Sequence, residues 1–349
     1  MPWTKIEPVS EAMELLWLSE STDRVLEYPE AIREALDHAL SVDPSVFVMG
    51  QDVDAKGGMF GTTNGLQEKH GADRCFDTPL AEAGMTGVAM GAALGGMRPV
   101  YVHNRPDFFF LTMDQLVNHA SKWHYMFGGA MSVPMVMWAC IGRGWGSGAQ
   151  HSQSLEGVFM QFPGLKFVMP STAYDAKGLL LAAIADPNPV VVIEHRFNFK
   201  YKGRVPEKAY TVPIGKGIVR RPGTDVTIAA ISHMAIEAVH AAEELEQAGI
   251  DAEVIDLRSL RPLDEDIVLR SVEKTGRLVV ADIGWKRGGF AAEIMAIVAE
   301  KGFHSLRAPV RRVTCADVPT PSGYTLEQAF YAGAKDIVDA VRAVVGGKG

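Results

Sequence analysis

Short hydrophobic runs alternate along the chain with longer segments of helical character, in two successive series. In the first series we expect strands at 45–50, 99–102, 133–141, 165–169 and 190–193 and helices at 80–97, 113–126 and 174–185. In the second we expect strands at 225–231, 252–256, 278–281 and 310–314 and helices at 233–248, 264–273 and 289–301. Apolar runs without polar alternation are typical of strands buried on both faces. Their interleaving with helices predicts an α/β fold with parallel, doubly wound sheets.

Charged residues together with Gly203, Pro206 and Pro213 interrupt the pattern between the two series. Glycine and proline end regular elements, so we expect an interdomain linker over 197–212. We expect residues 1–25 to form an arm that lies on the surface or against a partner.

Composition narrows the class of protein. The chain has 349 residues, of which 47% are hydrophobic and 22% charged, as in globular proteins, which excludes a mainly disordered or fibrous state. The net charge of −8 argues against a nucleic-acid-binding surface. No apolar run is long enough to cross a membrane and no N-terminal leader pattern is present, which predicts a cytoplasmic protein. The cysteines (Cys75, Cys140, Cys315) are far apart and predict neither a disulfide framework nor a zinc site.

Glu82 is the one charged residue in the segment 78–97, which is otherwise rich in glycine and alanine. Glycines destabilise a helix, so this many of them suggests that another backbone or a flat ligand comes very close. A carboxyl group in such surroundings should have a raised pKa and could donate a proton near neutral pH. The alternative is that Glu82 only stabilises the first helical turn.

Two other segments are candidates for a site. Gly144 and Gly146 of the glycine-rich loop 142–148, with Ala149 after it, fit G-x-G-x-x-A. The acid that a dinucleotide site needs about 20 residues later is missing, so nicotinamide binding is disfavoured. His151 follows this loop and is either a proton carrier or a surface histidine. In the run 108–110, three consecutive phenylalanines cannot all face one core, so at least one should face a ligand or another chain, unless the run is a buried junction.

The chain resembles the β subunits of the thiamine-diphosphate-dependent first component of the pyruvate, branched-chain and acetoin dehydrogenases, within the transketolase superfamily. The segments that carry the resemblance are 76–100, 113–122, 148–154, 163–180, 186–194, 255–264 and 313–321. The resemblance implies a transketolase-like pyrimidine-binding domain over 26–196 and a transketolase C-terminal domain over 213–346. It implies decarboxylation of a 2-oxo acid and transfer of the acyl group to a lipoyl group.

The resemblance also implies roles for single residues. Glu82 matches the glutamate that activates the cofactor through its pyrimidine ring, and Phe108 matches a phenylalanine that stacks on that ring. Leu80 and Gln51 fall at further cofactor-binding positions, and His151 matches a catalytic histidine that assists acyl transfer. The positions that match a potassium site, formed mainly by backbone carbonyls, are Met135, Ala183, Ile184, Asp186 and Asn188.

The chain contains no GDG motif, by which related enzymes hold magnesium and the cofactor's diphosphate. The resemblance therefore implies that an α subunit supplies this half of the site in an α₂β₂ heterotetramer, with a lipoyl-bearing acyltransferase core as a further partner.

Three segments depart from the family's pattern. They are Gln51, where an acid is usual, the run His103-Asn104-Arg105-Pro106, and the stretch 194–199, which includes His195 and Arg196. Because of these departures, the resemblance does not identify the substrate. Arg105 and Arg196 could recognise an anionic substrate or one bulkier than pyruvate. The departures also keep a split transketolase-like carboligase as an alternative. A scaffold without chemistry is a weaker alternative because Glu82, Phe108 and His151 are all present.

Overall fold

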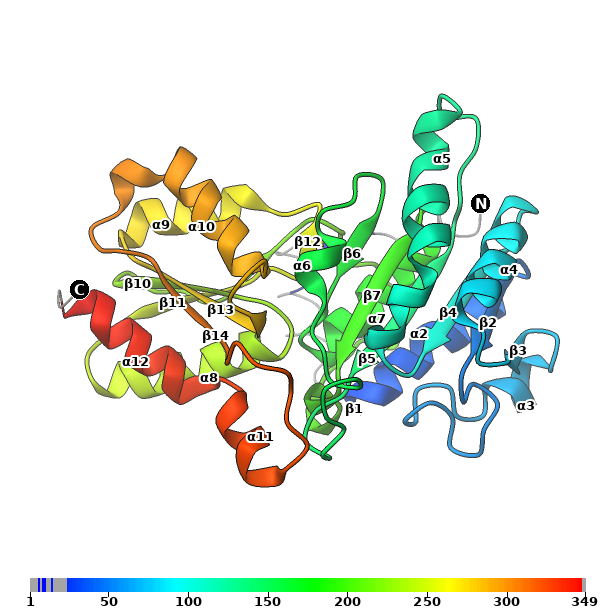
Figure 1. The fold of residues 1–349 in the computed structure, drawn as a ribbon, viewed down its shortest axis with the longest axis horizontal. Coiled ribbons are helices and arrows are strands. Elements are labelled where there is room, and N and C mark those ends of the chain that lie inside the picture. The colour runs from blue at the N-terminus through cyan, green and yellow to red at the C-terminus, as the bar shows by residue number, and fades with distance from the viewer. Residues whose placement is uncertain (1–5, 7, 11–13, 15–23, 347–349) are drawn as a thin grey trace. The chain divides into compact units, whose positions relative to one another are not determined.

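The computed structural model describes residues 6, 8–10, 14 and 24–346, so most of the predicted N-terminal arm lies outside the described residues. The chain divides into two compact units (Figure 1). The first comprises the chain up to Ile141 together with Gln161–Ile214, and the second comprises Gly142–Met160 and Gly215 onward. Among the helices described, none is long and apolar enough to cross a membrane.

A parallel sheet forms the centre of the first unit. Its strands are β2 (Val46–Gly50), β3 (Cys75–Asp77), β4 (Arg98–His103), β5 (Val136–Ile141), β6 (Lys166–Val168) and β7 (Val190–His195). They lie in the order β6-β7-β5-β4-β2-β3, and every pair is parallel. All residues of β2, β4, β5 and β7 are buried, which confirms the prediction from their unbroken hydrophobic runs.

Helices cover both faces of this sheet. On one face α2 (Tyr28–Val42) and α7 (Ala173–Ala185) pack against each other and contribute to the main hydrophobic core. On the other face lie α4 (Glu82–Leu94) and the π-helix η3 (Asp114–Ala120), which continues into α5 (Ser121–Met126). The remaining elements of this unit are β1 (Val25–Glu27), α3 (Leu66–His70), the 3-10 helices η2 (Pro106–Thr112) and η4 (Arg196–Lys200), and β8 (Lys202–Arg204), which pairs with β1.

The segment predicted as a linker packs against the first unit. Phe199, Val205, Tyr210 and Val212 are buried in the core that α2 and α7 share. The backbone N–H of Val212 also donates to the carbonyl of Gly178 in α7, at 3.1 Å. Residues 199–212 therefore complete the core of the first unit instead of connecting two bodies loosely.

The second unit contains its own sheet, in the order β14-β13-β10-β11-β9. The strands are β9 (Ile218–Arg221), β10 (Val226–Ala230), β11 (Ala252–Asp256), β13 (Leu278–Trp285) and β14 (Arg311–Cys315). All pairs are parallel except β9 with β11. The predicted strands and helices of both series are present within a few residues, so the prediction of a doubly wound α/β fold is confirmed.

Two pairs of helices cover this second sheet (Figure 1). One pair is α8 (His233–Gln247) with α12 (Ala334–Val345), and the other is α9 (Glu265–Thr275) with α10 (Phe290–Lys301). The shorter elements are α6 (Glu156–Phe159), β12 (Ser259–Arg261), η5 (Phe303–Ser305) and α11 (Tyr324–Phe330).

Candidate functional site

The candidate site lies at one edge of the first unit's sheet. Strands β2, β4 and β7 run parallel and end at Gly50, His103 and His195. Binding sites of open parallel sheets form beyond the carboxyl ends of the strands. The residues that follow these strand ends, with the start of α4, therefore form the candidate site, and they include Gln51 and Glu82.

Glu82 is the first residue of α4, and its side chain is partly exposed. The Gln51 side-chain amide donates a hydrogen bond to Glu82 Oε1 at 3.4 Å, and Thr86 Oγ1 donates to the Glu82 backbone carbonyl at 2.7 Å. Burial, assisted by the nearby charge of Glu82, raises the pKa of Tyr101 on β4 to about 12. The structure thus brings the predicted positions Gln51 and Glu82 together at the sheet edge.

The helix that begins at Glu82 presents an open face of small residues. A Cβ atom added to Gly84, Gly87 or Gly91 would meet no other atom within 4 Å, and Val88 between them is 54% exposed. The sequence predicts that a backbone or flat ligand approaches these glycines, and the described residues supply neither. The apolar surroundings predicted for Glu82 therefore require a group from outside this chain.

Gln51 is also connected to the unusual run after β4. Its side-chain carbonyl accepts from the backbone N–H of Asn104 at 3.5 Å, and the Asn104 side-chain amide donates to Asp52 at 2.7 Å. The two departures that the sequence singled out separately, Gln51 and the run that begins at His103, therefore lie side by side.

His103 is a buried polar group that the sequence did not assign to the site. Its ring lies between Tyr101 and Phe109, with ring centroids 4.2 and 4.8 Å away. Burial lowers the pKa of His103 to about 3, so the ring is neutral, and neither of its nitrogens has a hydrogen-bond partner. Buried polar groups are normally satisfied, so this ring is an exception, and at 0% exposure it is closed off from the surface.

The phenylalanine run divides between core and surface. Phe109 is completely buried, Phe108 is partly exposed and Phe110 is 48% exposed, while Leu80 before α4 is 78% exposed. The prediction that these phenylalanines do not share one core is confirmed. Phe108 and Leu80 are thus accessible for contact with a cofactor or partner.

His151 lies on a different unit from the residues above. It is exposed in the segment 142–160, which belongs to the second unit. The backbone N–H groups of Gly144 and Gly146 donate to the Glu327 carboxylate at 2.7 and 3.4 Å, and these bonds hold the glycine-rich loop to the second unit. The structure therefore does not assemble His151 and Glu82 within one unit.

A pair of buried carboxyl groups near this loop was missed. Glu156 and Asp282 are 1% and 0% exposed, and burial together with the charge of Glu156 raises the pKa of Asp282 well above its ordinary value. Burial beside a second acid therefore favours the protonated form of Asp282. Gly284 leaves room for them, because a Cβ atom there would lie 2.1 Å from Glu156 Oε1. The sequence could have indicated this pair, because Asp282 is the one acid in the otherwise apolar strand β13.

The positions predicted for potassium contain a protein cation. The Arg98 guanidinium donates to the backbone carbonyls of Ile184 at 2.8 Å and Asp186 at 3.1 Å. The other predicted positions are Met135, Ala183 and Asn188, whose backbone groups form hydrogen bonds in the same region. These contacts do not favour an additional potassium ion, and that site stays a prediction.

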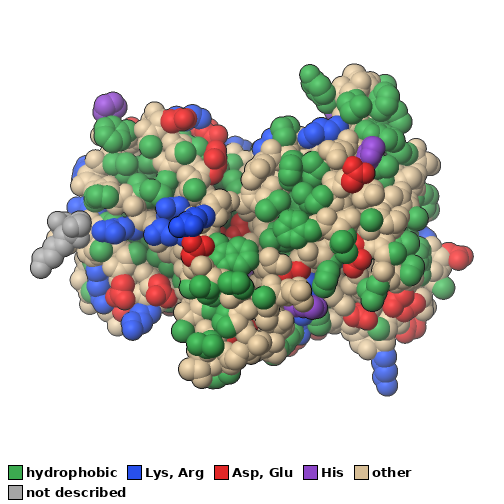
Figure 2. All heavy atoms as spheres, in the orientation of Figure 1, with side chains coloured by type: hydrophobic (Ala, Val, Ile, Leu, Met, Phe, Trp, Pro, Cys, Tyr) green, Lys and Arg blue, Asp and Glu red, His purple; other side chains and the backbone are tan. Residues whose placement is uncertain are grey.

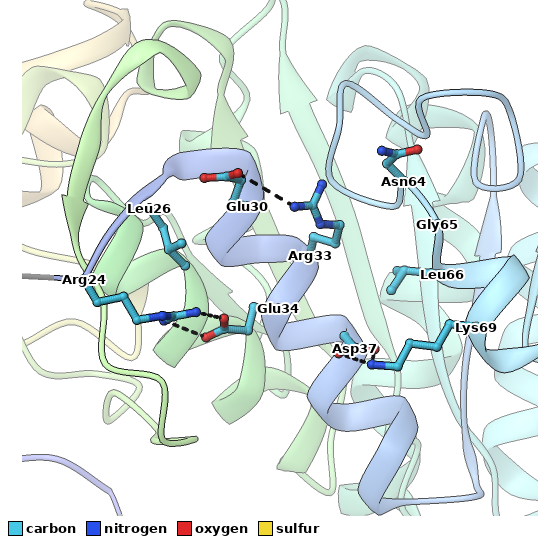
Figure 3. Close-up of a pocket in the computed structure, with 10 residues that line it drawn as sticks. All are labelled: Arg24, Leu26, Glu30, Arg33, Glu34, Asp37, Asn64, Gly65, Leu66 and Lys69. Atoms are coloured by element: carbon cyan, nitrogen blue, oxygen red, sulfur yellow. Dashed lines mark hydrogen bonds and ion pairs between the residues drawn. The ribbon is translucent and has the colours of Figure 1, made fainter.

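The first unit also contains a pocket of about 340 Å³ between α2 and the start of α3 (Figure 3). Its acids are paired with basic side chains, as Arg24 with Glu34, Arg33 with Glu30 and Lys69 with Asp37. The remaining lining residues are Leu26, Asn64, Gly65 and Leu66. This pocket contains none of the predicted site residues, so it is not the candidate site.

Metal-binding clusters are absent from the part of the chain that the structure describes. No group of three or more His, Cys, Asp or Glu side chains there could hold a metal ion. At the sheet edge the Glu82 carboxyl group and the Gln51 amide instead lie near partly exposed apolar side chains, which suits a flat heteroaromatic ring.

Two family models match the chain. The transketolase pyrimidine-binding domain matches residues 24–202, and the transketolase C-terminal domain matches residues 215–337.

Several curated proteins are similar over almost their whole length. The β subunit of acetoin:2,6-dichlorophenolindophenol oxidoreductase from Bacillus subtilis is 43% identical, over 93% of this chain and 98% of its own length. From the same organism, the β subunit of the pyruvate dehydrogenase E1 component is 42% identical, over 90% of this chain and 97% of its own length. The 2-oxoisovalerate dehydrogenase β subunit, also from Bacillus subtilis, is 40% identical, over 91% of this chain and 98% of its own length.

A solved structure described as a split-gene transketolase in an inactive β4 tetramer has the same fold. Its TM-score is 0.72 at 24% identity, and the match covers 92% of this chain and 98% of that one.

Proposed function

Because the chain belongs to the family of 2-oxo acid dehydrogenase β subunits with transketolase-type domains, we propose that it is the β subunit of a thiamine-diphosphate-dependent 2-oxo acid dehydrogenase. The enzyme would decarboxylate a 2-oxo acid and transfer the acyl group to a lipoyl group, and it would be active only with an α subunit. The observation that carries this proposal is the placement of Glu82, beside Gln51 at the carboxyl edge of the first sheet.

Glu82 would act on the pyrimidine ring of the cofactor. Thiamine diphosphate supplies the carbon nucleophile and the electron sink for decarboxylation. Glu82 would share a proton with a ring nitrogen. The partner subunit and the cofactor would remove water from around its carboxyl group. Gln51 would orient the carboxyl group through its side-chain amide.

The remaining residues would position the ring and serve the acceptor. Phe108 and Leu80 are accessible and apolar, so they would pack on the pyrimidine and exclude water. His151, exposed on the second unit, would transfer a proton during acyl transfer to the lipoyl group. These roles stay proposals for each residue.

The partner would complete the cofactor site. The chain contains no GDG motif, so an α subunit would hold magnesium and the diphosphate. Exposed apolar side chains of the first unit are consistent with such a partner, as Leu80, Val88, Phe110, Leu111, Tyr125, Met126 and Phe127 are each at least 47% exposed. An α₂β₂ assembly, a lipoyl-bearing core and a cytoplasmic location are part of the same proposal.

The test is decarboxylation by the purified complex of this chain with its α subunit. With thiamine diphosphate, magnesium and a set of 2-oxo acids, we expect decarboxylation coupled to an artificial electron acceptor or to a lipoyl domain. Glu82→Gln should lower kcat by about 100-fold or more and leave the complex assembled, because the amide cannot hold the shared proton. Glu68→Gln, an exposed change on α3 of the same unit, is the matched control. Full activity of Glu82→Gln would contradict the proposed role, and carboligation without decarboxylation would favour the transketolase-like alternative.

A further inference from the structure

Two arginines at the candidate site contact the same aromatic ring. The guanidinium carbons of Arg105 and Arg196 lie 5.0 and 4.4 Å from the centroid of Phe60. Arg105 follows β4 and Arg196 follows β7, so both lie at the carboxyl edge of the first sheet. The charge of Arg105 adds to the effect of burial in lowering the pKa of Arg196, which places the two cations within electrostatic reach.

Arg105 lacks a carboxylate partner. It is only 8% exposed, and its guanidinium donates to the backbone carbonyls of Asn104 at 2.7 Å and Cys140 at 3.4 Å. None of the described residues forms an ion pair with it. A buried cation is normally paired with an acid, so a cation held only by carbonyls and a ring is available for an anion from outside.

The one acid on β7 does not form an ion pair with Arg105. Glu194 precedes His195 and is completely buried, and its carboxyl group accepts a hydrogen bond from the Tyr28 hydroxyl on α2. Burial raises the pKa of Glu194 to about 8, so the group is mostly protonated at neutral pH. The Asp52 and Glu82 carboxyl groups accept hydrogen bonds from the side-chain amides of Asn104 and Gln51.

The loop that supplies Phe60 is held in a strained conformation. Phe60 has φ +53°, which a bulky side chain rarely adopts. Hydrogen bonds within the loop fix its neighbours, since the Met59 N–H donates to Thr63 Oγ1 at 2.9 Å and Thr62 Oγ1 donates to the Met59 carbonyl at 2.5 Å. Strain of this kind persists where the surrounding structure enforces it, often at a binding site. Here it keeps an aromatic ring against both guanidinium groups.

We propose that Arg105 and Arg196 bind a second anionic group of the substrate, so that the enzyme acts on a 2-oxo acid that carries a carboxylate or phosphate-type group at its far end. The inference rests on the proposed function and names its substrate class. Guanidinium groups match carboxylate and phosphate oxygens geometrically. The pair suits an anion that the product retains, because cations on the carboxylate that leaves as CO₂ would stabilise the ground state more than the transition state.

The position of the pair agrees with this role. Arg105 adjoins Asn104, whose backbone donates to Gln51, and Gln51 donates to Glu82. Hydrogen-bonded residues therefore connect the proposed anion site with the group that would act on the cofactor.

The test compares substrates that differ at one end. The α/β complex is assayed with 2-oxoglutarate, with its phosphonate analogue 2-oxo-4-phosphonobutanoate, and with 2-oxopentanoate, whose far end is an uncharged methyl group. We expect a kcat/KM at least 10-fold higher for one of the two substrates with a second anionic group than for 2-oxopentanoate, and the better of the two identifies the anion. Arg105→Met and Arg196→Met should each lower that kcat/KM at least 10-fold and leave the value for 2-oxopentanoate within about 2-fold. Arg33→Gln on α2 removes a guanidinium group elsewhere in the same unit and should leave kcat/KM unchanged for both kinds of substrate.

Two results would overturn the inference. One is a wild-type preference for 2-oxopentanoate, and the other is an equal loss for all substrates in both arginine variants, which indicates a structural role. Equilibrium binding of 2-oxoglutarate and of its phosphonate analogue to the cofactor-loaded complex separates the two proposals. If no 2-oxo acid is turned over, the proposed function fails. The arginine site then stands only if one of these probes binds and each arginine variant weakens that binding at least 10-fold.

Discussion

Burial of the Glu194 carboxyl makes a single residue responsible for a pH dependence of folding. The side chain is completely buried at the end of β7, and loss of hydration raises its pKa from an ordinary 4.5 to about 8. In the unfolded chain the group is exposed and releases its proton at lower pH. Between about pH 4.5 and 8 the folded state therefore binds a proton that the unfolded state has lost.

This difference in bound protons sets the direction in which the free energy of unfolding changes with pH. The free energy of unfolding should fall as the pH rises through this window, because the folded state binds more protons than the unfolded state. Glu194→Gln has no group to titrate, so its free energy of unfolding relative to wild type should rise by about 3 kcal/mol between pH 5 and pH 8. Denaturant unfolding of both proteins, followed by circular dichroism at several pH values, measures this difference in the free energy of unfolding.

A surface change serves as the control for Glu194. Glu68→Gln alters an exposed carboxylate on α3 and should leave the pH slope close to that of wild type. Parallel curves for wild type and Glu194→Gln across the window would show that Glu194 is ionised in the folded protein, and the argument from burial would then be wrong.

Among the elements, α2, α7 and the chain after β8 are held together by one buried lysine. Lys177 on α7 is 1% exposed, and its ammonium donates to Glu34 on α2 and to the carbonyl of Pro206 at 2.6 Å. The carbonyls of Glu207 and Lys208 lie 3.1 Å away. The ammonium thus satisfies three carbonyls and an acid that face the same interior point.

Lys177→Met should therefore be strongly destabilising. The substitution keeps the apolar stem but leaves buried carbonyls and the Glu34 carboxylate without this donor, which should lower the free energy of unfolding by about 3 kcal/mol. Lys69→Met is the matched control, because Lys69 forms an ion pair with Asp37 at 2.7 Å while 58% exposed, and its loss should cost less than about 1 kcal/mol. Equal effects of the two substitutions, measured by denaturant unfolding, would contradict this account.

How well the sequence predicted an element depended on the local pattern. The strands β2, β5 and β7 were predictable because unbroken apolar runs are typical of strands inside a parallel sheet. Helix α2 was missed although its Ala, Ile and Leu residues are buried on one face and Pro29 in its first turn is a favourable helix start. The single helix predicted at 113–126 is a π-helix followed by a short α-helix, a difference that no periodicity argument resolves.

The candidate site was only partly predictable for a related reason. Glu82 stood out as an isolated charge, and the resemblance identified its role. The pairing of Arg105 with Arg196 depends on loop 51–65, in which Phe60 adopts a conformation that sequence alone does not indicate. The raised pKa of Asp282 and the unpaired nitrogens of His103 depend on burial, which is a property of the folded chain.

At the scale of the whole molecule, the first unit displays apolar surface that a partner should cover. Val88 is 54% exposed in the middle of α4, and Tyr125 and Met126 at the C-terminal end of α5 are 89% and 63% exposed. Hydrophobic side chains, green in Figure 2, gather at the upper right of that view, where Figure 1 shows the end of α5. The glycines beside Val88 allow another backbone to approach α4 closely. Clusters of this kind on a soluble protein mark interaction sites.

Val88→Glu should separate folding from assembly. The side chain is already half exposed and glutamate favours helices, so the isolated chain should keep its stability within about 0.5 kcal/mol. A carboxylate placed against a partner's backbone would be buried without a counter-ion, so the affinity for the α subunit should fall at least 10-fold. Sedimentation of mixtures of the two subunits measures the affinity. Phe303→Glu, at a 63%-exposed site of the second unit, is the control and should assemble as wild type does. If Val88→Glu also assembles normally and retains activity, α4 does not face the α subunit, and the surroundings proposed for Glu82 must come from the cofactor alone.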